Sequence, residues 1–218
     1  MLSIAEEIVL LALDDETGKL STRLPVHSLR NAVSGALLMD LAFENRIDTD
    51  LHRLIVIDAA PLGEPVLDDV LAQIASNEEE RETGHWVHLI AGEYETLQPQ
   101  LLDRLVARGI LSQREGRLSW LHGVRRYPTV DDRPQRDAKQ RITDTLASEV
   151  IPHPRDIAII CLADACALWR SVIDERELAE AKPRIEQIVK MDLIGQSVTR
   201  TIRELQDATR GEEAKWFR

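Results

Sequence analysis

The sequence predicts a mainly α-helical protein: a single globular helical domain around two central buried helices, with a protruding β-hairpin. Two stretches, residues 28–47 and 157–172, are apolar on nearly every face of a helix. Hydrophobic residues make up 44% of the chain but aromatic residues only 4%, so the core is expected to be aliphatic. The length of 218 residues fits one medium-sized domain.

The helix predicted at residues 28–47 repeats leucine or valine at every fourth position, which places these side chains on one face. Further apolar residues widen this face until Asp40 is the single polar residue between Ala36 and Phe43. A helix that is apolar all round lies inside a domain. Asp40, and Asp164 in the second such helix, are therefore expected to be structural carboxylates held by hydrogen bonds.

Local start and turn signals define the other elements. Ser3 and Glu6 form a capping box before a first helix at residues 4–13. Residues 48–58 favour strands, and Ile110 to Trp120, interrupted by a Glu-Gly-Arg turn, is the best candidate for a hairpin. Further helices are predicted at 66–76, 86–91, 99–108, 137–150, 156–172, 175–191 and 197–207. The domain is expected to span residues 1–209, before a frayed tail at 210–218.

Composition and charge limit the classes of function. The net charge of −11 disfavours a nucleic-acid partner, because such proteins present a basic face. The acidic N-terminus is unlike a secretory leader, and no apolar run has the length of a membrane span. We therefore expect a cytoplasmic protein whose membrane contact, if it has one, is peripheral.

The motifs of common enzymes are missing from the sequence. It contains no nucleophile elbow, phosphate-binding loop, zinc-protease or dinucleotide-binding motif, so we expect no catalytic residues and no cofactor. His85 and His88 are spaced to share a metal, but no third ligand follows from the spacing, and no metal is expected. Cys161 and Cys166 are interpreted as small buried hydrophobic residues.

One segment suggests an alternative of a different class. Residues 99–127 predict a helix that carries Arg104 and Arg108, followed by a two-stranded wing. This is the layout of a winged-helix DNA-binding regulator, whose helix enters the major groove. A purely structural helix–hairpin unit has the same pattern, and the acidic net charge favours that interpretation.

Five segments together resemble a known family. In chain order they are EEIVLLALDDETGKLS, SGALLMDLAFENRID, HWVHLIAGE, LLDRLVARGIL and IICLADACALW, and they span roughly residues 3–205. They are similar to five segments of the Golgi phosphoprotein 3 family, from its acidic, leucine-rich opening helix to its late buried helix. His85 stands where the family has asparagine. The chain resembles a bacterial-type member, without the N-terminal tail of eukaryotic members.

The resemblance implies a function at membranes. Eukaryotic members are non-enzymatic peripheral membrane proteins that bind phosphatidylinositol 4-phosphate in a basic pocket. They also hold Golgi glycosyltransferases by their cytoplasmic tails. We therefore expect this chain to bind a phosphoinositide or another anionic phospholipid headgroup, and to adapt membrane or cargo proteins. An adaptor that binds proteins and has lost its lipid pocket is the remaining alternative.

The resemblance also places the site. The family's pocket tryptophan falls on Pro25, and its three pocket arginines fall on Ser34, Glu95 and Gln98. These departures remove positive charge or aromatic surface, and Arg23, His27 or Arg30 would compensate if the register shifts by a few residues. The headgroup site is accordingly expected at Arg23, Pro25, Arg30, Ser34, Glu95 and Gln98. The family's hairpin serves in oligomerisation and membrane approach, which implies contacts through Trp120, Arg125 and Arg126.

Overall fold

The computed structural model describes residues 1–14, 19–20, 26–50, 53–77, 81–113, 127–191, 198–200 and 202–204. The elements in these ranges are α1 (Ile4–Ala12), α2 (Val26–Phe43), β1 (Ile47–Thr49), β2 (Leu54–Val56), α3 (Pro65–Ala75), α4 (Thr83–Gly92), α5 (Tyr94–Ala107), α7 (Arg133–Ala147), α8 (Pro154–Ala165), the 3-10 helix η1 (Leu168–Ser171) and α9 (Glu175–Ile188). The fold is mainly α-helical, as the sequence predicts.

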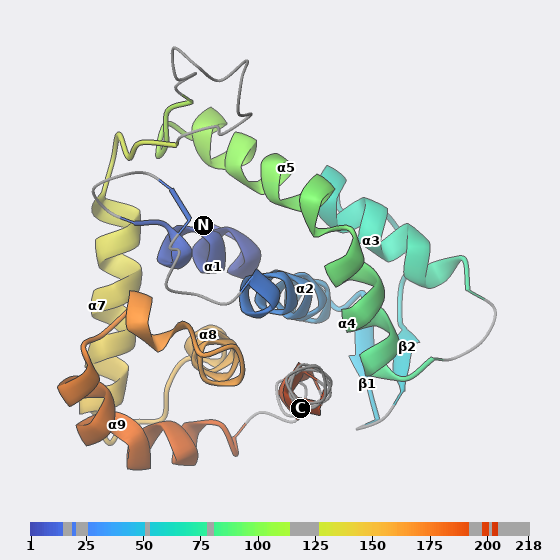
Figure 1. The fold of residues 1–218 in the computed structure, drawn as a ribbon. Coiled ribbons are helices and arrows are strands. Elements are labelled where there is room, and N and C mark those ends of the chain that lie inside the picture. Colours follow the sequence, from blue (N-terminus) through green and yellow to red (C-terminus); the bar gives the residue numbers. More distant parts are fainter. Residues whose placement is uncertain are drawn as a thin grey trace, which may run out of the picture.

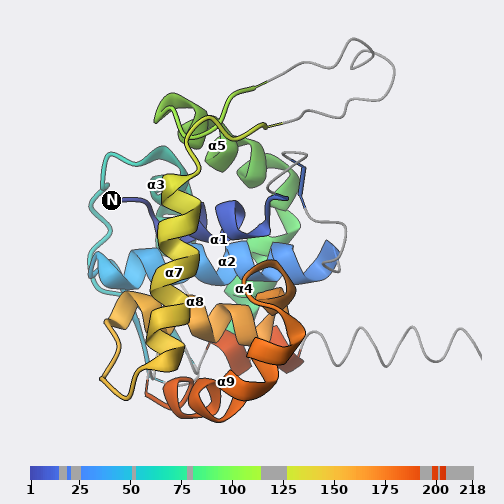
Figure 2. The ribbon, with the colours of Figure 1, turned by 90° about the vertical axis from the view of Figure 1, so that its left-hand side faces the viewer.

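Two buried helices, α2 and α8, form the centre of the fold. Both are seen end-on in Figure 1, with α1, α4 and the helical segment around residues 198–204 beside them. In Figure 2 the same two helices run side by side across the molecule, and α7 crosses them. The predicted pair of central helices is therefore confirmed.

The end of α2 differs from the prediction. The helix stops at Phe43, because Asn45 adopts a left-handed conformation with φ 54° and the N–H of Arg46 turns back to the carbonyl of Leu41 at 2.9 Å. Phe43, which the sequence pattern places on the apolar face, is 45% exposed. The apolar face of α2 thus ends one turn before the predicted end of the helix.

The second central helix is also shorter than predicted. It ends at Ala165, and Ala167 takes a left-handed φ of 54° before the chain enters η1. Asp164 lies at this end and is only partly buried. Its carboxylate accepts hydrogen bonds from Arg203 at 2.5 Å and from the indole of Trp169 at 3.4 Å. It is a structural carboxylate that ties the segment around Arg203 to the end of α8.

A glycine allows the C-terminal helical segment to pack closely on the two central helices. A Cβ atom at Gly35 of α2 would lie 2.7 Å from Leu162 of α8, 2.9 Å from Val198 and 3.1 Å from Ile202. Val198 and Ile202 are themselves buried in the core. The missing side chain of Gly35 therefore creates the space in which these helices meet.

The β-structure consists of short pieces in the described ranges. β1 and β2 form an antiparallel pair in which Ile47 lies opposite Val56, and all of their residues except Ile47 fall within the predicted strand region. The tip of the hairpin predicted at Ile110 to Trp120 falls outside the described residues. Leu111, near the start of this segment, pairs in an antiparallel bridge with Thr129, which lies beyond the predicted hairpin.

The helix that precedes the Leu111–Thr129 bridge, α5, begins at Tyr94, earlier than predicted, and contains Pro99. Within the described ranges, no helix combines the length and the hydrophobicity needed to cross a bilayer.

Candidate functional site

Four of the predicted headgroup residues lie in the described part of the chain. Arg30 and Ser34 are on α2, and Glu95 and Gln98 are on α5. The other predicted contacts fall outside the described residues: Arg23, Pro25, Trp120, Arg125 and Arg126.

Arg30 is the cation of this group, and α5 holds it in place. Its Nη2 lies 2.5 Å from Oε1 of Glu95, and its guanidinium carbon lies 5.7 Å from the centre of the Tyr94 ring. The side chain of Arg30 is 33% exposed, and its Nε is buried without a hydrogen-bond partner. Tyr94 is buried, and this burial, helped by Glu95, raises the pKa of its hydroxyl. Arg30 is thus oriented by two α5 residues and still faces solvent.

Ser34 lies one turn further along α2 and is turned toward the core. It is fully buried, and its hydroxyl donates a hydrogen bond of 2.7 Å to the carbonyl of Val87 on α4. Its visible role is to join α2 to α4. Arg30, one helical turn earlier, is the α2 residue that reaches the surface beside Glu95.

Among the described residues, the surface between α2 and α5 presents the ion pair of Arg30 and Glu95. Glu95 is 73% exposed and forms its ion pair with Arg30, while Gln98 lies one turn further along α5 and is partly buried. The pair is neutral overall, whereas a site for a doubly charged phosphate needs excess positive charge. The structure therefore brings Arg30, Glu95 and Gln98 to one surface but leaves that surface without a net positive charge among its described residues.

Sequence reasoning missed a cluster of buried carboxylates at the start of α1. Glu6 is fully buried and lies 3.0 Å from Nε of Arg104 on α5 and 3.3 Å from Nε of Arg108, the residue that follows α5. Arg104 also pairs with Glu64, and Arg108 donates to the carbonyl of Met1. The two cations on which the winged-helix alternative depends are thus engaged by the protein itself.

Glu7, the next residue, is held from the other side of α1. Its carboxylate lies 2.5 Å from Nη2 of Arg141 on α7 and 3.3 Å from Nη2 of Arg155 on α8. Arg141 also donates to buried Asp156 at 2.5 Å. Burial of Arg141 lowers its pKa, but these two carboxylates outweigh that effect and raise the pKa overall. One signal in the sequence pointed here: two adjacent glutamates in a helix whose other seven residues are apolar.

Asp40 completes this cluster. Its carboxylate accepts the N–H of Ile4 at 2.8 Å and the N–H of Ala5 at 3.0 Å, two donors that the first turn of α1 cannot satisfy itself. Burial raises its pKa to about 6, against the lowering effects of these bonds and of Arg155. The expected structural, hydrogen-bonded role of Asp40 is therefore what the structure shows.

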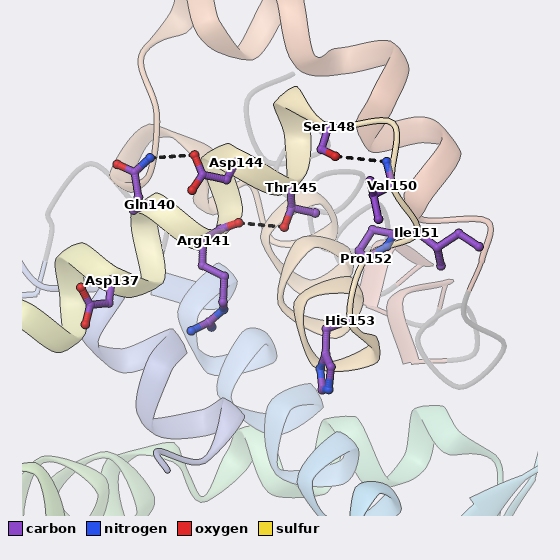
Figure 3. Close-up of a pocket in the computed structure, with 10 residues that line it drawn as sticks. All are labelled: Asp137, Gln140, Arg141, Asp144, Thr145, Ser148, Val150, Ile151, Pro152 and His153. Atoms are coloured by element: carbon purple, nitrogen blue, oxygen red, sulfur yellow. Dashed lines mark hydrogen bonds between the residues drawn. The ribbon is translucent and has the colours of Figure 1, made fainter.

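An open pocket of about 600 Å³ lies between α7 and the loop that leads into α8 (Figure 3). Its lining residues are Asp137, Gln140, Arg141, Asp144, Thr145, Ser148, Val150, Ile151, Pro152 and His153. The side chains of Val150 and Ile151 are strongly exposed. Arg184 of α9 donates a hydrogen bond of 2.6 Å to the carbonyl of Val150. The pocket thus combines carboxylates with two unburied aliphatic side chains. No sequence signal pointed to it.

A metal site does not emerge from this geometry. Within the ranges that the structure describes, no three His, Cys, Asp or Glu side chains gather as metal ligands. Cys161 and Cys166 are buried in the core and are not joined by a disulfide, and burial raises the pKa of the Cys166 thiol.

Comparison with known proteins decides the family. The family model described as Golgi phosphoprotein 3 (GPP34) matches residues 4–205. The chain belongs to the Golgi phosphoprotein 3 family. The match begins with α1 and reaches the segment that packs on Gly35, so it covers the cluster of buried carboxylates, the Arg30–Glu95 pair and the pocket of Figure 3.

Curated relatives agree with membership of the Golgi phosphoprotein 3 family. One is the vacuolar protein sorting-associated protein 74 of Schizosaccharomyces pombe, which is 28% identical over 207 residues covering 81% of this chain and 60% of the relative. The protein of the same name from Eremothecium gossypii is 27% identical over 207 residues, with coverage of 79% and 61%. This chain therefore spans about three fifths of the length of these relatives.

Proposed function

We propose that this chain is a non-enzymatic peripheral membrane protein that recognises the phosphate of a phospholipid headgroup through Arg30, where α2 meets α5. The observation that carries the proposal is that the Arg30 guanidinium is held in one orientation and yet is partly exposed to solvent. Its guanidinium is oriented by Tyr94 and Glu95, is 33% exposed, and has no other partner among the described residues. Membership of the Golgi phosphoprotein 3 family supports the choice of a membrane lipid as ligand.

The chemistry of arginine suits this role. A guanidinium presents several N–H donors in one plane, which match the oxygens of a phosphate. Ordering a long side chain on binding costs conformational entropy. Contact with the buried Tyr94 ring removes part of that cost before a ligand arrives. Gln98 adds an amide that can donate a further hydrogen bond from α5.

The membrane contact proposed for the hairpin stays a prediction at Trp120, Arg125 and Arg126, together with self-association through the same hairpin.

A second role, as an adaptor for membrane or cargo proteins, is favoured by the pocket of Figure 3. Its exposed Val150 and Ile151 offer an apolar contact, and Asp137 and Asp144 offer charges to a basic segment of a partner. The names of the curated relatives, which refer to protein sorting, agree with this role.

The experiment is vesicle flotation of the native chain and of Arg30→Ala. The vesicles contain phosphatidylcholine alone, or phosphatidylcholine mixed with phosphatidylethanolamine, phosphatidylglycerol or phosphatidylinositol 4-phosphate. The native chain should float with at least one mixture, and Arg30→Ala should bind that mixture about tenfold more weakly, the size expected for a lost charged hydrogen bond.

Arg176→Ala is the matched control, because Arg176 is an exposed arginine of α9 paired with Glu180. It removes the same charge and should leave flotation unchanged. The proposal is wrong if the native chain floats with none of these vesicles, or if Arg30→Ala and Arg176→Ala behave alike.

A further inference from the structure

The ion pair between Arg30 of α2 and Glu95 of α5 leaves a hydrogen-bond acceptor and hydrogen-bond donors unused at one surface. Oε1 of Glu95 is paired with Nη2 of Arg30 at 2.5 Å, and no other described residue pairs with Glu95. The other carboxylate oxygen therefore stays available, since the Glu95 side chain is 73% exposed. On the cation, the N–H donors of Nη1 have no partner among the described residues, whereas Nε is buried away from the surface. An unused acceptor and unused donors thus lie side by side.

A ligand that carries only negative charge fits this arrangement poorly. A phosphate placed on Arg30 would lie close to Glu95, because the two side chains are in direct contact. Two like charges at such a distance repel each other, and a second negative charge on the phosphate increases the repulsion. Displacing Glu95 would relieve the repulsion but would also break the ion pair that positions Arg30.

The charge of the whole chain points the same way. Acidic residues outnumber basic ones by 38 to 27, for a net charge of −11. A protein with this charge is repelled by a strongly anionic bilayer, whereas a bilayer of zwitterionic lipids carries no net charge to oppose its approach. Local and global electrostatics therefore both disfavour a polyanionic headgroup.

We propose that Glu95 makes this site selective for a zwitterionic headgroup that carries a phosphate and a primary ammonium group, as in phosphatidylethanolamine. The phosphate is bound by Arg30, and the ammonium donates to the free oxygen of Glu95. A primary ammonium has N–H donors for this bond, and the trimethylammonium of phosphatidylcholine has none. The inference rests on the proposed function and names its headgroup class.

The test compares the native chain with Glu95→Gln in the same flotation series. The native chain should bind vesicles containing phosphatidylethanolamine about tenfold more strongly than phosphatidylcholine vesicles. Glu95→Gln should lose this preference and gain affinity for vesicles with phosphatidylglycerol or phosphatidylinositol 4-phosphate. Glu186→Gln, at an exposed position of α9, makes the same charge change and should keep the native preference.

A soluble competitor separates the headgroup from the packing of the bilayer. Glycerophosphoethanolamine should displace the native chain from these vesicles, and glycerophosphocholine should not. Stronger native binding to the anionic vesicles, or a phosphatidylethanolamine preference that survives Glu95→Gln, overturns this inference. Neither of these outcomes contradicts the proposed function as long as Arg30→Ala still reduces binding. Flotation with none of the vesicles overturns the proposed function itself.

Discussion

Asp40 provides a quantitative test of the packing around α1. Its buried carboxylate accepts the backbone N–H groups of Ile4 and Ala5, and burial raises its pKa from 3.8 to about 6. In the unfolded chain the same group titrates near 3.8. Between these two values the folded state binds more protons than the unfolded state. The contribution of Asp40 to the free energy of unfolding is therefore greatest at acidic pH and is lost as the pH rises through this window.

The magnitude follows from the two pKa values. A difference of about two units corresponds to about 3 kcal/mol, of which about 2 kcal/mol is lost between pH 4.5 and 7.5. Asp40→Asn removes the titrating group and one hydrogen-bond acceptor, so it adds a cost that does not depend on pH. The free energy of unfolding of the native chain, minus that of Asp40→Asn, should fall by about 2 kcal/mol over this range.

The assay is urea unfolding followed by circular dichroism at several pH values. Asp144→Asn, at an exposed position of α7, controls for the removal of one negative charge. A difference between the native chain and Asp40→Asn that does not change with pH would refute the reasoning. It would mean that Arg155 and the two backbone donors offset the burial of the carboxylate.

Two further predictions concern packing and charge. Gly35→Ala places a Cβ atom 2.7 Å from Leu162 and 2.9 Å from Val198, so overpacking should exceed the gain in helix propensity and lower stability by about 1 kcal/mol. A melting temperature at or above that of the native chain would contradict the close approach of these helices. Arg141→Met leaves buried Asp156 without its ion pair and Glu7 with Arg155 alone. It should cost about 2 kcal/mol in urea unfolding, less than a fully buried pair because Arg141 is 39% exposed, and an unchanged midpoint would show that the pairs do not contribute.

Local patterns predicted much of the fold, because they depend on neighbours in sequence. The capping box of Ser3 and Glu6 and the apolar faces of α2 and α8 are of this kind, and all three are present. The ends of α2 and α8 were predicted too late. They depend on the left-handed conformations of Asn45 and Ala167, which no local pattern required.

The site was harder to predict for a different reason. Which face of a helix meets solvent depends on the helices packed around it. The winged-helix alternative requires Arg104 and Arg108 to be free for DNA, whereas in the structure Glu6 of α1 lies beside both. Ser34 and Arg30 are one turn apart on α2, yet one is in the core and the other at the surface. The prediction from the family resemblance named both residues and could not choose between them.

The way α1 is held has a consequence for synthesis of the chain on the ribosome. Its first turn depends on Asp40, Arg104 and Arg141, which lie 36, 98 and 134 residues away from their partners in the sequence. At about 5–20 residues per second, roughly 7–27 s separate the synthesis of Glu7 from that of Arg141. During that interval α1 lacks α7 and α8, whereas α2 and α5, which also pack on it, are made earlier. α1 thus completes its contacts only after α7 and α8 have been made, and until then part of its apolar surface stays uncovered.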